Sequence, residues 1–193
     1  YYTLPNLSKL FLIKIAKNLL FFTIIAKKVE HRAQKKRIRK IFPSFSFFNL
    51  TQYIENNLEE MVALETLLTS IPAMAPESEG QGELKKCEAL EKWLKEHGIT
   101  DLTRYDAPDS RVESGIRPNL VATIPGKSDD YSIWVMAHMD VVPVGDLSMW
   151  KTDPWKVERK DGKIYGRGVE DNQQGLVAGI FAALAYLQIG EKP

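Results

Sequence analysis

A histidine and two aspartates are the residues of this sequence best suited to bind a metal ion. His138 and Asp140 are separated by one residue, and Asp171 follows thirty-one residues after Asp140. A neutral imidazole nitrogen can ligate zinc, and a nearby carboxylate can fix the tautomer of the ring by accepting its other N–H. A carboxylate can also bridge two cations about 3.5–4 Å apart, as in two-metal hydrolases. The triplet alone is a weak signal, because a buried His bonded to an Asp is also a common structural pair.

The predicted elements around these residues would bring them together. Residues 131–137 are apolar on both faces, which predicts a central strand covered on both sides. Residues two apart on a strand point to the same side, so His138 and Asp140 should emerge together at its carboxyl end, where open α/β folds place their sites. Asp171 precedes residues 176–187, which are apolar almost all round and predict a helix packed on the sheet. The positive end of that helix would favour an ionised Asp171.

The remaining pattern after residue 50 is that of an α/β protein. Apolar residues at helical spacing predict one helix from Thr51 to about residue 70, ended by prolines, and a second over residues 79–97, ended by Gly98. Residues 102–105, 119–124 and 131–137 are predicted strands. The turn-forming residues 125–130 favour an antiparallel hairpin between the last two of these strands.

The chain contains a single cysteine, Cys87. A disulfide framework and a cysteine-rich zinc site are therefore excluded. Cys87 shares a predicted helix with Leu84, Leu90 and Leu94, so we expect it to be a buried small apolar residue. The absence of a disulfide fits a reducing compartment and favours a cytoplasmic location.

Residues 1–50 differ in composition from the rest of the chain. They hold 11 Lys and Arg and one acid, Glu30, whereas the formal net charge of the whole chain is +1. Their apolar runs are shorter than the roughly 20 residues needed to span a bilayer. We expect residues 1–50 to be a basic apolar leader that is helical or non-native, and we favour a non-native or non-functional leader over two alternatives. The first is a basic helix lying on a membrane surface, and the second is a nucleic-acid-binding arm, for which no stacking pattern is present.

A longer ordered pattern surrounds the metal-ligand candidates. It comprises His138-Met139-Asp140-Val141-Val142-Pro143-Val144-Gly145-Asp146, then Trp150, Asp153-Pro154-Trp155, Asp161-Gly162, and Tyr165-Gly166-Arg167-Gly168 through Asp171. This pattern closely resembles the co-catalytic zinc metallopeptidase family of aminoacylase, succinyl-diaminopimelate desuccinylase, acetylornithine deacetylase, carnosinase and glutamate carboxypeptidase. A looser resemblance extends from about residue 52 to the end of the chain. Residues 1–50 are not covered.

The resemblance implies a three-layer α/β/α zinc-exopeptidase-like mixed sheet, truncated, with the basic segment 1–50 as an extra N-terminal piece. By position, His138 would ligate one metal and Asp171 would bridge two. Asp140 would be the catalytic-site carboxylate that orients His138. The cofactor implied is zinc, as two divalent ions in the complete enzyme, with cobalt or manganese as alternatives. Arg167 and Tyr165 resemble scaffold for the turn that presents Asp171, and the two tryptophans of the pattern would pack the loop over the site.

Two departures from the family qualify this prediction. Members usually continue Asp-x-Lys-Gly after the bridging aspartate, whereas this chain reads Asp171-Asn172-Gln173-Gln174-Gly175. The Gln in place of Lys leaves the ligand intact and makes the substrate class uncertain. The general-base glutamate, the further ligands and the lid domain that mediates dimers in the family fall beyond Pro193.

The sequence therefore predicts residues 51–193 to be the N-terminal part of a zinc-dependent hydrolase of peptide or N-acyl amide bonds. Its substrate would be a small peptide or an N-acyl amino acid, and the complete enzyme would be a homodimer. The fragment is expected to be inactive as it stands. The alternative is a non-catalytic remnant, or a membrane-surface binding module that uses residues 1–50.

Overall fold

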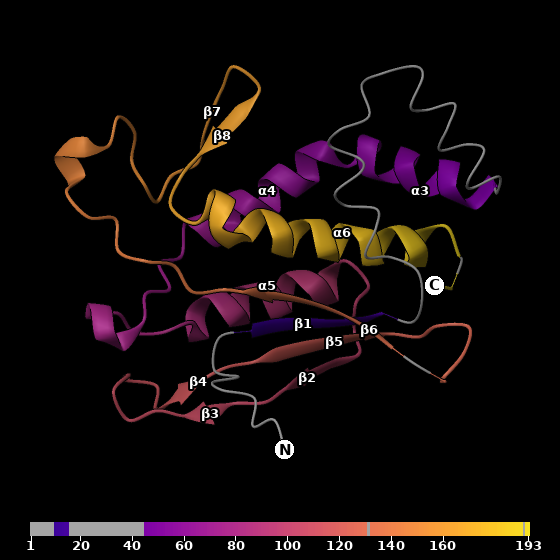
Figure 1. Cartoon of the computed structure of the whole chain (residues 1–193), viewed down its shortest axis with the longest axis horizontal. Coiled ribbons are helices and arrows are strands. Elements are labelled where there is room, and N and C mark those ends of the chain that lie inside the picture. Colours follow the sequence, from indigo (N-terminus) through magenta and orange to yellow (C-terminus); the bar gives the residue numbers. More distant parts are fainter. Residues whose placement is uncertain (1–9, 16–44, 131, 191) are drawn as a thin grey trace.

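The computed structural model of the chain describes residues 10–15, 45–130, 132–190 and 192–193 (Figure 1). The helices are α3 (Phe45–Asn56), α4 (Leu58–Thr69), α5 (Leu84–Glu96) and α6 (Gln174–Gln188), with short helical turns η1 (Pro76–Ser78), η2 (Leu147–Met149) and η3 (Val169–Gln173). The strands are β1 (Leu10–Ile15), β2 (Leu102–Arg104), β3 (Ala107–Pro108), β4 (Ile116–Arg117), β5 (Leu120–Ile124), β6 (Ile133–His138), β7 (Glu158–Lys160) and β8 (Lys163–Tyr165). The chain combines helices with a mixed sheet, so the α/β class predicted from the sequence is confirmed.

Four strands form the main sheet in the order β2-β5-β1-β6. β1 is parallel to β5 and antiparallel to β6, and β2 is antiparallel to β5. Leu10 pairs with His138 in this register, so the first residue of β1 lies beside the last residue of β6. The other strands form two small antiparallel pairs, β3 with β4 and β7 with β8.

The predicted hairpin between residues 119–124 and 131–137 is wrong. The two strands run in opposite directions, but β1 lies between them and pairs with both. The turn composition of residues 125–130 reports that the chain reverses, and it cannot report whether a third strand enters between the two arms. The prediction that the second strand is central and covered on both sides is also wrong, because β6 is an edge strand whose Trp134 and Met136 are exposed.

The N-terminal fifty residues are described only in part. Leu10–Ile15 form a strand, which corrects the helical structure expected for residues 1–50 at these six positions. This run is apolar except for Lys14, a composition that suits a strand flanked by two others. The expectation for residues 1–9 and 16–44 lies outside the described residues. Within the described part of the chain, no helix combines the length and the apolar character that crossing a membrane requires.

One hydrophobic core joins the sheet to the helices. Leu120, Ala122 and Ile124 are alternate residues of β5, so they share one face of the sheet, and all three are buried. Figure 1 shows α4, α5 and α6 on the same side of this sheet. The core residues contributed by these helices are Leu64, Leu68, Cys87, Leu90, Trp93, Leu94, Leu176, Val177, Ile180, Phe181, Ala183, Leu184 and Tyr186. The described residues therefore form a helical layer packed on one face of a mixed sheet.

The helix boundaries refine the sequence predictions. The predicted helix from Thr51 is two helices, because α3 and α4 are separated at Asn57, whose Nδ2 donates to the backbone oxygen of Tyr53 at 2.8 Å. α5 begins at Leu84 rather than at residue 79, since Glu79 has a left-handed backbone (φ 59°) that a helix cannot continue. Gly98 (φ 88°) follows the end of α5, as predicted.

Candidate functional site

The three residues predicted to form the site lie together in the structure. His138 ends β6, and its Nε2 lies 3.0 Å from Oδ1 of Asp171. Its Nδ1 lies 3.0 Å from the backbone oxygen of Asp140 and 3.2 Å from the carboxylate Oδ1 of the same residue. The Asp140 side chain is mostly buried at 18% exposure, whereas that of Asp171 is 85% exposed. The imidazole is thus held from the protein side and presented toward solvent.

These contacts determine which nitrogen of His138 carries a proton. Both neighbours of Nδ1 are oxygens of Asp140 that only accept hydrogen bonds, so Nδ1 must donate. A neutral ring then directs the lone pair of Nε2 at the Asp171 carboxylate, which is also an acceptor. Two acceptors 3.0 Å apart require a shared cation, either a proton or a metal ion. An imidazole nitrogen and a carboxylate oxygen are both donor types that zinc accepts, so these two side chains are candidate ligands of one ion.

Asp171 is presented by a tightly packed turn, η3, between β8 and α6. Gly168 begins this turn with φ 82°, and its carbonyl accepts a hydrogen bond of 3.0 Å from the backbone N–H of Gln173. A side chain at Gly168 would overlap the Gln173 amide and lie 2.5 Å from Cγ1 of Val141. Glycine at 168 therefore permits both the left-handed backbone and the close approach of the chain that follows Asp140.

Gln173, which stands where the family usually has Lys, points into the protein. It is 1% exposed, and its Nε2 donates to the backbone oxygen of Arg167 at 3.2 Å. Its Oε1 accepts a hydrogen bond of 3.2 Å from the hydroxyl of Thr69, the last residue of α4. The sequence suggested that this position bears on substrate choice. Its contacts instead connect the turn that presents Asp171 to the end of α4.

The loop after Asp140 is held against the same turn. The indole N–H of Trp150 donates to the backbone oxygen of Val144 at 2.8 Å, and the Arg167 guanidinium lies 5.1 Å above the Trp150 ring. Arg167 also donates to the same Val144 oxygen at 3.4 Å. These contacts give Trp150 and Arg167 the loop-packing and scaffold positions that the sequence predicts for them.

The described residues do not complete a metal site. Among them, no group of three or more His, Cys, Asp and Glu side chains is arranged to hold a metal ion. Catalytic zinc sites usually have three protein ligands and one open position. His138 and Asp171 therefore provide two neighbouring donors of suitable type, and any further donors would have to come from other residues.

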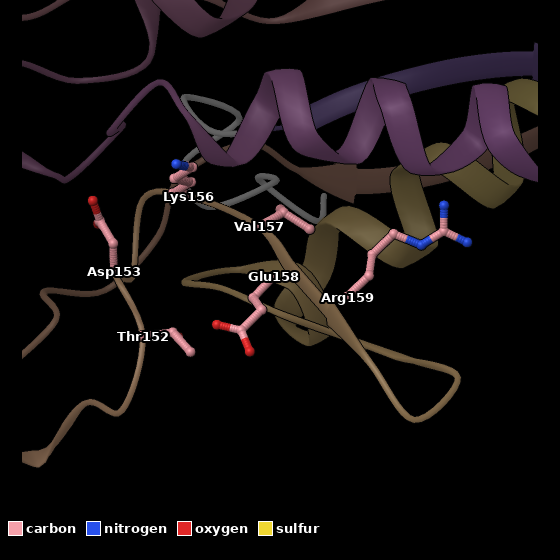
Figure 2. Close-up of a pocket in the computed structure, with 6 residues that line it drawn as sticks. All are labelled: Thr152, Asp153, Lys156, Val157, Glu158 and Arg159. Atoms are coloured by element: carbon pink, nitrogen blue, oxygen red, sulfur yellow. The ribbon is translucent and has the colours of Figure 1, made fainter.

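A separate surface hollow of about 320 Å³ lies beside the β7–β8 pair. It is lined by Thr152, Asp153, Lys156, Val157, Glu158 and Arg159. Figure 2 shows Arg159 directed away from Thr152 and Asp153, and its guanidinium pairs with Glu59 at 2.5 Å. The lining includes neither the metal-ligand candidates nor Asp140, so this hollow is not the site of the predicted chemistry.

Sequence reasoning missed a buried lysine behind the site. Lys86 in α5 is 1% exposed, and within the described part of the chain its Nζ has no hydrogen-bond partner. Burial lowers the pKa of Lys86 to about 8, against the attraction of Asp140 and, to a smaller extent, of Glu83. A signal existed in the sequence, because Lys86 stands four residues before Leu90 and eight before Leu94, on the apolar face of the helix.

Comparisons with known proteins agree with the sequence pattern. Residues 134–193 match the model of peptidase family M20/M25/M40. An uncharacterized metallohydrolase of Methanococcus maripaludis is 41% identical over 128 residues, which cover 63% of this chain and 30% of the relative. A succinyl-diaminopimelate desuccinylase of Cereibacter sphaeroides is 35% identical over 127 residues, which cover 66% of this chain and 30% of that protein. The chain thus spans about 30% of the length of these relatives.

A solved structure agrees with the fold. The di-peptidase Dug1p of Saccharomyces cerevisiae aligns with a TM-score of 0.59 at 21% identity, over 75% of this chain and 32% of that one. At this identity the likeness supports the fold alone. Together with the family match over residues 134–193 and the two relatives, it confirms the resemblance predicted from the sequence.

Proposed function

We propose that this chain carries part of the metal centre of a hydrolase that cleaves peptide or N-acyl amide bonds in small substrates. The observation that carries the proposal is the 3.0 Å separation of His138 Nε2 and Asp171 Oδ1, with Asp140 holding Nδ1 on the other side of the ring. The match of residues 134–193 to a peptidase family supports the reaction class. The names of relatives, a desuccinylase and a di-peptidase, support an N-acyl amino acid or a short peptide as substrate.

In this proposal each residue has a distinct role. His138 would bind the cation through Nε2, and Asp171 would bind it through its exposed carboxylate, where it is free to bridge a second ion. Asp140 would hold Nδ1 protonated, so that Nε2 keeps its lone pair for the cation. A divalent cation supplies Lewis acidity toward the amide carbonyl at such a site. We propose zinc, because the donor set is one imidazole and one carboxylate, with cobalt and manganese as the alternatives.

Turnover would require more than these residues. The described part of the chain offers two donors, and it places no third His, Cys, Asp or Glu with them in an arrangement that could hold a metal ion. We therefore expect this 193-residue chain to bind zinc weakly and to lack hydrolase activity by itself. A cytoplasmic location and a homodimeric complete enzyme remain predictions from the sequence.

The test is zinc binding by the purified chain, measured by competition with a chromophoric chelator. His138→Ala and Asp171→Asn should each weaken zinc binding by at least about tenfold, because each removes a direct ligand. Asp161→Asn, a matched substitution at an exposed turn of the β7–β8 pair, should leave the affinity unchanged. Equal zinc affinity in all four proteins would exclude a metal site at His138 and Asp171.

A further inference from the structure

A fully buried ion pair joins the start of α5 to β4. Arg117 donates from Nε to Oε2 of Glu83 at 2.5 Å, and from Nη2 to the other oxygen of the same carboxylate. Neither side chain is more than 2% exposed. The remaining guanidinium nitrogen, Nη1, lies 3.5 Å from Oδ2 of Asp109. Two charge-assisted hydrogen bonds therefore define the direction of the pair in a place that water does not reach.

The ion pair adjoins one end of a loop, residues 73–82. Glu83 follows this loop directly, and Arg117 packs against its last residue, because a Cβ at Gly82 would lie 3.1 Å from Cδ of Arg117. The loop folds back on itself, since the backbone N–H of Gly82 donates to the Met74 oxygen at 3.0 Å. The contacts of the ion pair thus extend through Gly82 to the first residues of the loop.

Those first residues hold the chain that follows the candidate histidine ligand. The backbone N–H of Val141 donates to the Ala73 oxygen at 3.0 Å, and Met74 and Val141 form a parallel β-bridge. Asp140, directly before Val141, is the residue whose backbone and carboxylate oxygens lie beside Nδ1 of His138. A shift of the loop would therefore move the residue that orients the imidazole.

Val141 also approaches the turn that presents the second ligand candidate. Its Cγ1 lies 2.5 Å from the position that a Cβ of Gly168 would take, and Gly168 begins that turn. We infer that Glu83 and Arg117 are positioning residues, whose ion pair holds the 73–82 loop and, through Val141, the spacing of the two ligand candidates. This inference rests on the proposed metal-binding function.

A role in stability alone accounts less well for a buried ion pair. Removing two charges from water costs about as much as their attraction returns, so apolar side chains of similar volume are often as stable or more so. Apolar side chains do not supply a defined direction, whereas a planar guanidinium and a carboxylate joined by two hydrogen bonds do. The two explanations therefore predict different results when the pair is replaced by apolar residues.

The experiment makes that replacement, Glu83→Leu with Arg117→Met, and measures thermal unfolding, zinc affinity and hydrogen exchange of the Val141 amide. The double variant should melt at no lower temperature than wild type. It should nevertheless bind zinc about threefold to thirtyfold more weakly, the range expected for residues that act through a packed network. Without zinc, the Val141 amide should exchange at least about tenfold faster, because the loop that accepts its hydrogen bond opens more often.

The matched control is Glu59→Leu with Arg159→Met. Glu59 and Arg159 also form a pair with two hydrogen bonds, but both side chains are exposed. This control should change neither the zinc affinity nor the exchange of Val141. Arg117→Lys keeps the charge and loses the planar fork, so it should show the same two changes as the apolar double variant, to a smaller extent. Arg117→Lys decides between the explanations if the double variant does not fold.

Wild-type zinc affinity and wild-type Val141 exchange in the substituted ion pair would overturn the inference, as would losses that the control pair reproduces. Failure of the wild-type chain itself to bind zinc would instead refute the proposed function. The exchange of Val141 is measured without metal, so it tests the link from the ion pair to Val141 in either case. The two failures are therefore distinguishable.

Discussion

Thr69 Oγ1 donates a hydrogen bond to Oε1 of Gln173 across 104 residues of sequence, with both side chains buried. This contact joins the last residue of α4 to the turn that presents Asp171. Gln173 also donates to the backbone oxygen of Arg167, so its amide is satisfied on both ends. The position of Asp171 relative to His138 therefore depends on a side chain that does not itself face the site.

Removing the Gln173 amide should destabilise the fold. Gln173→Leu leaves the Thr69 hydroxyl and the Arg167 carbonyl buried without this partner, which costs about 1–3 kcal/mol in the free energy of unfolding. Urea unfolding would measure this change. Gln174→Leu, a matched change at an exposed neighbour, should cost less than about 0.5 kcal/mol. Equal effects of the two substitutions would show that the Thr69–Gln173 contact contributes nothing to stability.

Gly168→Ala should lower the free energy of unfolding more than the same substitution at another glycine with a left-handed backbone. Gly168→Ala meets the Gln173 amide and Val141, in addition to the strain of φ 82°. We expect a loss of at least about 2 kcal/mol, since left-handed backbone costs about 1–2 kcal/mol and overpacking adds to it.

Gly162→Ala is the control, because Gly162 has φ 71° with nothing near its Cβ position. It should show the backbone cost alone. Urea titration would measure the loss in the free energy of unfolding for Gly168→Ala and for Gly162→Ala. The difference between the two losses is the packing contribution at Gly168. If Gly162→Ala were as destabilising as Gly168→Ala, the close approach of Val141 and Gln173 would not matter.

Lys86 should give the stability of the fold a distinctive alkaline dependence. Burial lowers its pKa from 10.5 to about 8, while Asp140 and Glu83, the latter paired with Arg117, oppose the shift. Between about pH 8 and 10.5 the unfolded chain keeps a proton that the folded chain has lost, so the free energy of unfolding rises with pH, by at most about 1.4 kcal/mol per pH unit.

The difference between wild type and Lys86→Met isolates this contribution. Urea unfolding of both proteins at several pH values should show wild type gaining stability relative to the variant as the pH rises through this window. Below about pH 8 the difference should be constant, because both states of the wild type hold the proton. A flat difference across the whole range would contradict the burial of an ionisable amine at this position.

The exposed edge of the main sheet should promote self-association. Trp134 and Met136 are 45% and 59% exposed on the same face of β6, and among the described residues β6 has a neighbouring strand on one side only. Such edges pair with other chains, and a charge on the strand discourages this. Met136→Lys should therefore shift the chain toward monomer in sedimentation velocity experiments. Met149→Lys, at a residue 81% exposed outside the sheet, should change association much less.

Local signals in the sequence predicted several elements correctly. The apolar spacing of Leu84, Leu90 and Leu94 with a following glycine predicts α5 and its end, and Cys87 is buried as expected. The His138-x-Asp140 spacing at the end of a strand, with Asp171 before a helix, predicts that these three side chains meet. The prediction of α5 depends on residues close to one another in the chain, and that of the site depends on where two separate segments end a strand and precede a helix.

Features that depend on distant residues could not be predicted. The turn at residues 125–130 carries no information about β1, which separates β5 from β6. The sequence shows a Gln at position 173 in place of Lys, but it does not show that the side chain points into the protein. That direction depends on its contact with the distant Thr69. The break at Asn57, where the backbone leaves the helical region (φ −107°, ψ 20°), interrupts a helical pattern that continues in the sequence.

The single thiol of the chain makes it a natural reporter of internal motion. Cys87 is fully enclosed in the core, and burial raises its pKa to about 12, so an alkylating reagent can neither reach it nor find it as thiolate in the folded state. The rate at which Cys87 is alkylated therefore reports how often the packed interior around α5 opens. No engineered probe is needed to compare those openings with and without added zinc.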